Sequence, residues 1–423
     1  MISKHGSAVA PTWPTVRLAR LTLGLQDGTH GTHERVDSGI PLLSAKNVTE
    51  RGLEVGEAES QIAETEAASI IARGFPRTGD VLLTIVGTIG RTAVYELSDP
   101  LPFQRSVCFV RPIHNVHSGY LCFALQSVAV QDQMRLRAKS SAQAGLYLGD
   151  VASLGIPRPT FEQQRRIAEF LARETAQIDE LIAKQEQLIS TLAERRKTSI
   201  RVFATTGLDS EVELTDGGEP WRDDFPRRWN PTPVNTIMRA VKQLVGDSWA
   251  LTQLLSLTKR GVIVRDIESG EGKYPESFET YQHIQPGDLV FCLFDVDETP
   301  RTVGLARQSG MLTGAYTRYV VDRRRAMPEW LEYYFTALDD EKRLRPVYTG
   351  LRKVITKDRF GSLRIPVPPL SEQAAIVEVL EDLTAKTDEL TAKAVRAVEL
   401  LRERRQALIS AAVTGQIDVG GAS

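Results

Sequence analysis

Cysteine is scarce in this sequence, and long apolar runs are missing. The three cysteines, Cys108, Cys122 and Cys292, lie far apart and form no Cys-x-x-Cys pair, which argues against a disulfide framework or a zinc ribbon. No stretch of about 18 uninterrupted apolar residues occurs, so we expect no membrane-spanning helix. The first 15 residues lack the apolar core of a signal peptide. These absences predict a reduced, cytoplasmic protein.

Signatures of catalysis are also missing. The sequence has no phosphate-binding loop ending in Gly-Lys-Ser/Thr and no Asn/Asp-Pro-Pro-aromatic motif of adenine methyltransferases. The histidines and carboxylates that resemble metal ligands lack the further ligands that a site needs. They are the pairs His30/His33 and His114/His117 and the loop carboxylates Asp295, Asp297 and Glu298. We expect no catalytic site and no bound metal on this chain.

A long internal repeat organises the 423 residues. Residues 154–209 and 363–418 align without a gap at an offset of 209 residues and are identical at 22 of 56 positions. That identity is far above chance and indicates a duplication. The repeats separate two variable blocks, so the sequence predicts four segments. They are block 1 (1–153), helical spacer 1 (154–209), block 2 (210–362) and helical spacer 2 (363–418).

Each repeat predicts an extended Ile-Pro-x-Pro segment followed by one long helix, because proline cannot occupy a helix interior. Apolar residues then recur at spacings of three, four and seven. A helix of about 40 residues would be about 60 Å long, and its apolar stripe needs a partner. We expect the two helices to pair as an antiparallel coiled coil; the alternative is that each packs on its own block. The predicted seam comprises Ile167, Leu171, Ile178, Ile182, Ile189, Leu192, Ile376, Leu380, Leu383, Leu390, Val398 and Leu401.

The two blocks predict α+β domains with curled, mixed sheets. In both, a Gly-Asp pair (Gly79-Asp80 and Gly287-Asp288) precedes an apolar run of strand type. Further strands are expected at 106–110, 261–264 and 317–321, and helices at 118–137 and 328–344. Beyond the Gly-Asp pairs, the two blocks cannot be aligned by eye.

The whole chain resembles the specificity subunit of type I restriction-modification systems. The similarity lies in the order of several short motifs together with the duplicated helices. The motifs are residues 27–30 (Asp-Gly-Thr-His), 40–48, 79–82 with 87–90 (Gly-Thr-Ile-Gly), 349–353, and the Ile-Pro exit at 365–369 followed by Ser371-Glu372-Gln373.

The resemblance implies how the chain acts. Each block would be a target-recognition domain that reads one half of a bipartite, asymmetric DNA site in the major groove. The helices would fix the spacing and dock two modification (methyltransferase) subunits, and restriction subunits would complete the complex. S-adenosylmethionine, ATP and Mg would then bind to those partner subunits, and this chain would carry no cofactor.

Side chains near the matched motifs, and in the basic stretch 299–360, are candidates for DNA contacts, because Arg and Lys bind guanine or phosphate and Asn and Gln bind adenine. They are Lys46, Asn47, Arg91, Gln104, Arg105, Arg307, Arg318, Arg352 and Lys353. Two other interpretations remain open at this point: a coiled-coil adaptor that does not bind DNA, and the specificity half of a fused restriction-modification enzyme.

Overall fold

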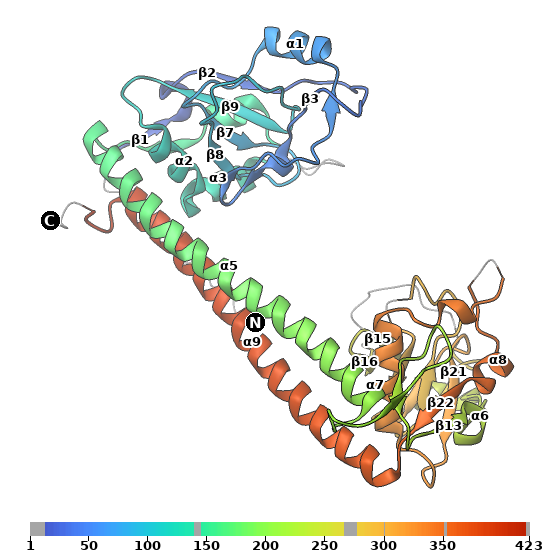
Figure 1. Ribbon diagram of the computed structural model, residues 1–423. Coiled ribbons are helices and arrows are strands. Elements are labelled where there is room, and N and C mark those ends of the chain that lie inside the picture. The colour runs from blue at the N-terminus through green and yellow to red at the C-terminus, as the bar shows by residue number, and fades with distance from the viewer. Residues whose placement is uncertain (1–12, 139–144, 266–276, 300, 351–352, 420–423) are drawn as a thin grey trace. The chain divides into compact units, whose positions relative to one another are not determined.

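The computed structural model describes residues 13–138, 145–265, 277–299, 301–350 and 353–419 (Figure 1). The chain divides into two compact units, residues 1–187 with 394–423 and residues 188–393. Each unit therefore contains one block and a part of both long helices. No helix in the described ranges is both long and apolar enough to cross a membrane.

The first unit is built on a four-stranded sheet in the order β2-β9-β7-β8, in which all neighbours are antiparallel. Shorter strand pairs surround it, and β1 pairs with the Ile-Pro strand β10. The elements of this unit are β1 (Thr15–Arg17), η1 (Leu18–Arg20), β2 (Thr22–Asp27), β3 (Ile40–Pro41), η2 (Ala45–Asn47), β4 (Val48–Thr49), β5 (Gly52–Leu53), β6 (Gln61–Ile62), α1 (Glu64–Arg73), β7 (Val81–Thr84), β8 (Thr92–Val94), β9 (Val107–Pro112), α2 (Ser118–Gln126), α3 (Val128–Arg137), α4 (Leu148–Ala152) and β10 (Gly155–Pro157).

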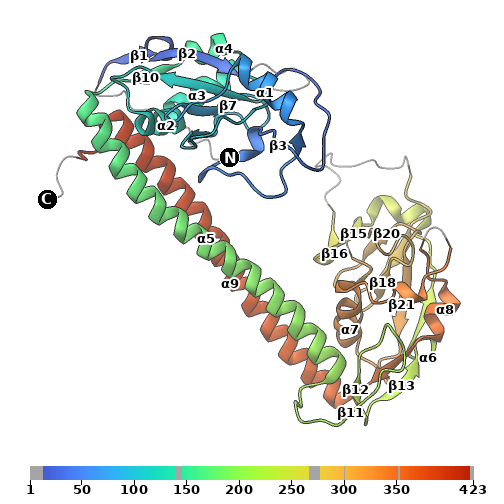
Figure 2. The same ribbon diagram turned by 45° about the horizontal axis from the view of Figure 1, so that its top comes forward.

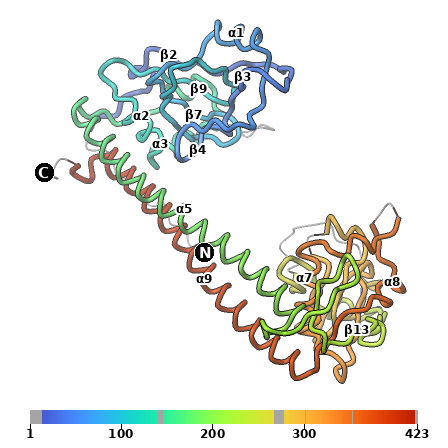
Figure 3. Tube along the Cα trace, in the orientation of Figure 1, coloured from blue at the N-terminus to red at the C-terminus, as the bar shows by residue number. Residues whose placement is uncertain are grey.

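The second unit repeats this design. Its four-stranded sheet has the order β14-β21-β18-β19, and β13, which Figure 3 labels, pairs with the Ile-Pro strand β22. Its elements are β11 (Leu214–Thr215), β12 (Phe225–Pro226), β13 (Asn230–Pro233), α6 (Val234–Ile237), β14 (Met238–Val241), η3 (Gly246–Leu251), β15 (Leu255–Thr258), β16 (Gly261–Val264), β17 (Gln282–Ile284), β18 (Leu289–Phe291), β19 (Val303–Leu305), β20 (Gly310–Leu312), β21 (Thr317–Val321), α7 (Pro328–Asp340), η4 (Arg345–Val347), α8 (Lys357–Ser362) and β22 (Arg364–Val367).

The blocks are thus structural copies, although their sequences do not align by eye. The predicted strands at 261–264 and 317–321 match β16 and β21, and the run after each Gly-Asp pair is the buried central strand β7 or β18. The helix expected at 118–137 is instead two helices, α2 and α3. They are separated at Ser127, whose backbone is extended (φ −60°, ψ 147°) and whose hydroxyl donates to Ala124 O at 2.7 Å.

The two repeats form single long helices, α5 (Phe161–Thr206) and α9 (Leu370–Thr414), which lie side by side in both ribbon views (Figures 1 and 2). In the first unit Arg405 of α9 pairs with Asp179 of α5 at 2.9 Å. In the second, Arg196 of α5 pairs with Asp388 of α9. A residue farther along α5 therefore meets one nearer the start of α9, and the helices run antiparallel.

Because of the duplication, the two Arg–Asp bridges join equivalent residues of the repeat. Asp179 and Asp388 occupy one repeat position, and Arg196 and Arg405 occupy another. One sequence pattern, used twice in opposite directions, therefore forms an Arg–Asp contact in each unit. Such paired charges specify register, which apolar contacts alone define poorly.

Most residues of the predicted seam are buried. Eight of the twelve residues are buried: Ile167, Leu171, Ile178, Ile182, Leu192, Ile376, Leu380 and Val398. Ile189, Leu383 and Leu401 are half-buried. At the helix ends the stripe also packs into the blocks, since Ile167 and Leu171 join the first block's core and Ile376 and Leu380 the second's. The alternative of helices packed on their own blocks therefore describes the ends only.

Leu390 was wrongly assigned to the seam, because it is 48% exposed. The buried face of α9 passes instead through Thr384, Thr387 and Ala394. A threonine can occupy a seam because its hydroxyl bonds back to its own helix. Thr387 Oγ1 donates to Leu383 O at 2.8 Å in this way. Apolar periodicity alone therefore misplaced the middle of the stripe.

Candidate nucleic-acid interface

In the first block, two of the matched motifs, residues 27–30 and 40–48, meet around residues 103–106. Thr29 N donates to Phe103 O at 2.7 Å, and Arg105 N donates to Thr29 O at 3.0 Å. Gln104 N donates to Leu43 O at 2.8 Å. Gly28 is required here, because a Cβ at that position would lie 2.2 Å from Phe103 O. The backbone thus brings residues 27–30, 40–48 and 103–106 into one surface cluster.

Lys46 and Arg105 are the exposed cations of this cluster. Lys46 Nζ lies 2.7 Å from Glu59 Oε2, and this hydrogen bond lowers the pKa of Glu59 below its ordinary value. Gln104 is half-buried beside Arg105. The arrangement places two cations and one amide where they can reach a ligand from solvent.

Asn47, another candidate DNA contact, is buried and fully engaged within the block. Its Oδ1 accepts from Ser44 N at 2.9 Å, and its Nδ2 donates to Glu54 O at 3.0 Å and to Glu59 Oε1 at 2.7 Å. All the polar atoms of the amide therefore hold the loop that carries Lys46. The contacts give Asn47 a structural role and leave it unavailable to a base.

Arg91 directly follows the Gly-Thr-Ile-Gly motif. It lines a pocket of about 380 Å³ together with residues of the α2–α3 region and with Arg402 and Arg405 of α9. Neighbouring Gly90 belongs to the Gly-Thr-Ile-Gly motif, which turns the chain between β7 and β8, and Gly90 N donates to Thr84 O at 2.9 Å. The motif is a hairpin connection with positive φ at Gly87 (80°) and Gly90 (93°).

One candidate of the second block is buried within it. Arg318 is only 4% exposed, its Nε lies 2.6 Å from Asp288 Oδ2, and its Nη1 donates to His283 O at 3.0 Å. Asp80 of the first block has the same kind of partner, Arg111, at 2.7 Å. The Asp of each Gly-Asp pair therefore forms a structural ion pair with an adjacent strand, and Arg318 is part of it.

Arg307 and Lys353 are exposed but paired. Arg307 Nη2 lies 3.0 Å from Glu332 Oε2, and Lys353 Nζ lies 2.9 Å from Asp297 Oδ2. Lys353 and Arg345 hold the pKa of Asp297 below its ordinary value. Asp297, one of the three loop carboxylates that resemble metal ligands in the sequence, is therefore engaged by two cations of its own block. Arg352 lies outside the described residues.

Two glutamines attach the blocks to the long helices, and sequence reasoning gave them no role. Gln164 and Gln373 occupy the same repeat position and are both fully buried. Gln164 Oε1 accepts from His117 N at 2.9 Å, and its Nε2 donates to Pro159 O at 3.0 Å.

Gln373 repeats the arrangement in the second unit. Its Oε1 accepts from Met327 N at 2.7 Å, and its Nε2 donates to Pro368 O at 2.8 Å. His117 and Met327 are the N-cap residues of α2 and α7. Each glutamine therefore connects the first turn of a long helix to the start of the main helix of its block. Their identity across the repeat was the signal that sequence analysis could have used.

Three of the histidines, His30, His33 and His117, have partners within the chain. His30 Nε2 lies 2.6 Å from Asp27 Oδ2, and His33 Nδ1 lies 2.7 Å from Glu66 Oε1. His117 Nδ1 accepts from Tyr120 N. Within the described ranges, no three His, Cys, Asp or Glu side chains group closely enough to hold a metal ion.

Two copies of one α+β domain, each attached in the same way to a duplicated antiparallel helix pair, define a two-domain protein built on a helical spacer. Residues 40–191 and 329–400 match the family model described as type I restriction modification DNA specificity domain. The chain belongs to this family.

Relatives span most of the chain. It is 23% identical over 349 residues to the type I restriction enzyme EcoKI specificity subunit of Escherichia coli K12, a match that covers 78% of this chain and 72% of the relative. It is 21% identical over 426 residues to the putative MjaX specificity subunit of Methanocaldococcus jannaschii, covering 96% and 94%. A solved chain of a type I R-M system, studied for complex assembly and conformational transition, superposes with a TM-score of 0.68 at 17% identity, covering 97% of this chain and 100% of that one.

Proposed function

We propose that the chain is the DNA-reading subunit of a type I restriction-modification complex. Each block reads one half of a bipartite, asymmetric site in the major groove. The observation that carries the proposal is the repetition of one domain, attached through equivalent glutamines to helices whose register is held by equivalent Arg–Asp bridges. Two copies of a domain with different surfaces are suited to two different half-sites.

Among the candidate contacts, Lys46, Gln104 and Arg105 form the reading surface of the first block. Arg307 and Lys353 contribute in the second, where DNA phosphates would compete with their present carboxylate partners. Asn47 and Arg318 are buried and stabilise the loops and strands that carry these surfaces. Arg91, which lines the pocket beside Arg402 and Arg405 of α9, is not assigned to this surface.

The paired helices set the spacing between the half-sites and bind the modification subunits. With 46 residues, α5 is about 69 Å long, which exceeds one turn of DNA, about 34 Å. Leu181 and Leu390 occupy one repeat position and are 46% and 48% exposed. Each unit thus presents an equivalent apolar residue outside the seam, which supports the docking of two copies of one partner.

The chemistry of the complex resides on its partners. The modification subunits bind S-adenosylmethionine and methylate adenine, and restriction subunits use ATP and Mg. This chain supplies recognition and does not catalyse a reaction. The proposal rests on the absence of catalytic motifs from the sequence and on the family membership.

Methylation mapping tests the proposal. A host that lacks other adenine methyltransferases would express the chain together with its modification subunit, and methylated adenines would be mapped across the genome. We expect one bipartite target with a fixed spacer, and loss of that target when Lys46 and Arg105 are both replaced by Ala. Methylation that ignores the identity of this chain would favour an adaptor that does not read DNA.

A further inference from the structure

One hairpin turn is duplicated inside the blocks at the same 209-residue offset as the helices. Thr49-Glu50-Arg51-Gly52 joins β4 to β5, and Thr258-Lys259-Arg260-Gly261 joins β15 to β16. In the first turn the threonine hydroxyl accepts from Arg51 N at 3.1 Å and donates to Gly52 O at 3.2 Å.

The second turn has the same hydrogen bonds. Thr258 Oγ1 accepts from Arg260 N at 3.1 Å and donates to Gly261 O at 3.1 Å. Both glycines have positive φ, 121° at Gly52 and 90° at Gly261, which other residues adopt at a cost. The turn is one scaffold used twice, so the difference between the copies lies in what its tip carries.

The first turn is engaged by the long helices. Arg405 Nη2 donates to Glu50 O at 3.1 Å, and Arg51 Nη2 lies 4.0 Å from Glu186 Oε2. The tip itself carries one acid and one base, so its charges cancel. In addition, the cation of the tip, Arg51, faces the carboxylate of Glu186 in the same unit.

The second turn has lost these compensations. Lys259 replaces the acid, so the tip carries two positive charges. The repeat position of Glu186 is Val395 in the second helix, and Arg196, which corresponds to Arg405, pairs with Asp388. Lys259 and Arg260 are exposed, and among the described residues neither side chain has an ion pair or hydrogen bond. Figure 2 labels the two strands, β15 and β16, that carry this turn.

We propose that Lys259 and Arg260 bind backbone phosphates of double-stranded DNA. This inference rests on the proposed function and adds the element that anchors the second block. A two-stranded ribbon is narrow enough to approach a DNA groove, and exposed cations gain free energy by releasing the counterions of phosphates. Because the turn's backbone is held by its own threonine and glycine, the tip presents charge in a fixed position. Phosphate contacts of this kind fix position and carry no base preference.

A salt series on DNA binding tests the inference. The chain is purified with its modification subunit, and its affinity for a duplex containing the methylated target and for a scrambled duplex is measured between 50 and 300 mM KCl, values chosen on the order of the range over which counterion release dominates. For K259A/R260A we expect the slope of log affinity against log salt to fall by about 1–2, since each phosphate contact contributes about 0.9. The ratio of affinities for the two duplexes should stay near that of the wild type.

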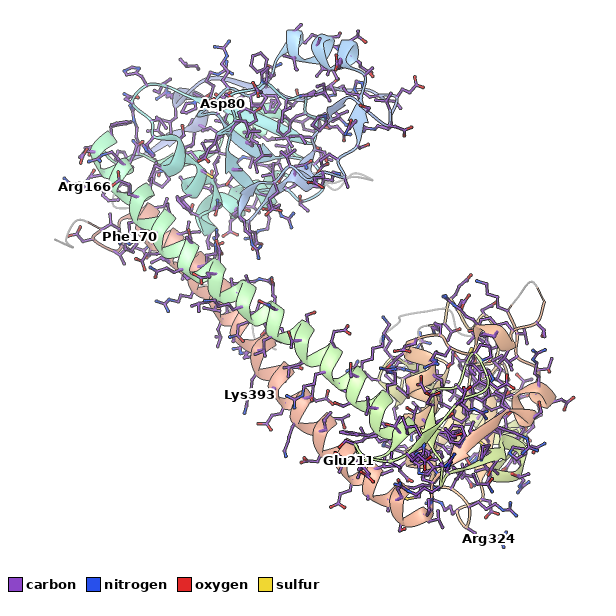
Figure 4. All side chains as sticks on the ribbon, viewed as in Figure 1. Asp80, Arg166, Phe170, Glu211, Arg324 and Lys393 are labelled. Atoms are coloured by element: carbon purple, nitrogen blue, oxygen red, sulfur yellow. The ribbon has the colours of Figure 1, made fainter. Side chains whose placement is uncertain are left out.

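Three variants serve as controls. K259R/R260K keeps both charges and should keep the slope. E50A/R51A changes the compensated first turn and should also keep it. R324A removes a cation that is paired with Asp322 at the edge of the second block (Figure 4) and should have no effect on the slope.

The outcomes separate the two ideas. If the K259A/R260A complex keeps the wild-type slope of log affinity against log salt, the phosphate contact is wrong. It is also wrong if R324A lowers that slope as much as K259A/R260A does. A lower target-to-scrambled ratio in K259A/R260A also overturns it, because the tip would then read bases. If the wild-type complex does not prefer its target over the scrambled duplex, the proposed function itself fails.

Discussion

Replacing Gln164 by Met removes the polar end of the first glutamine clamp while keeping a side chain of similar length. Two groups then lose their partners, the N–H of His117 and the C=O of Pro159, now bonded at 2.9 and 3.0 Å. A buried polar group without a partner costs about 1–3 kcal/mol. Because His117 is only half-buried, water can reach part of the site, and we expect a loss of about 2–4 kcal/mol.

Amide hydrogen exchange reports the loss of stability at the clamp itself. Global unfolding of a chain with two units does not show where stability is lost. The amide of His117 should exchange faster in Q164M by a factor of about 30 or more, since about 1.4 kcal/mol corresponds to a factor of ten. The amide of Met327, held by Gln373 in the other unit, should not change. Neighbouring Gln163 offers a matched control, because its exposed amide accepts only from Thr160, from its N–H at 2.9 Å and its hydroxyl at 3.0 Å.

The clamp also has a functional consequence. If Gln164 orients the first block on α5, Q164M should methylate sites whose spacer is one base pair too long or too short more often, relative to the correct site. A purely structural loss would lower methylation of all these sites alike. Equal His117 exchange in Q164M and Q163M, or an unchanged spacer preference, would refute the reasoning.

Two further predictions concern the helix pair. Ile182→Asp places an unpaired charge in the buried seam and should cost several kcal/mol, which would appear as a lower melting temperature. Leu181→Asp, one residue away on an exposed face, should melt like the wild type. It should instead reduce co-purification of the modification subunit. Arg405→Ala removes contacts to Asp179 and to the first block and should cost about 3 kcal/mol, whereas Arg196→Ala, at a 39% exposed side chain, should cost about 1 kcal/mol or less. If the two variants of either pair lost equal stability in thermal unfolding, burial would not determine the strength of these contacts.

Much of the architecture was predictable because duplication and periodicity are properties of the sequence itself. Two equal apolar stripes predict that the helices pair, and the position of one block at each end of the pair favours the antiparallel direction. The central strands β7 and β18 follow from apolar runs after Gly-Asp pairs. Leu390 was misplaced because apolar identity was taken as burial. The seam of α9 instead accepts Thr384 and Thr387, whose hydroxyls bond within their own helix.

The candidate DNA contacts were harder to predict, because residue type does not reveal burial. Asn47 and Arg318 have suitable side chains for DNA, yet the fold uses them for internal contacts. The turn at Lys259 and Arg260 was overlooked because four residues are too short to align between diverged blocks. It became visible only when the hairpins of the two blocks could be compared hydrogen bond by hydrogen bond.

Exchange of one block tests the central claim most directly. Residues 210–362 would be replaced by the corresponding block of a relative, and methylated adenines would be mapped in a host that also carries the modification subunit. Because each block has its own Ile-Pro strand pair and its own glutamine clamp, we expect one half of the methylated sequence to change while the other half and the spacer length stay the same. A chimaera in which both halves change together would contradict the account, since the two blocks would then form a single reading surface.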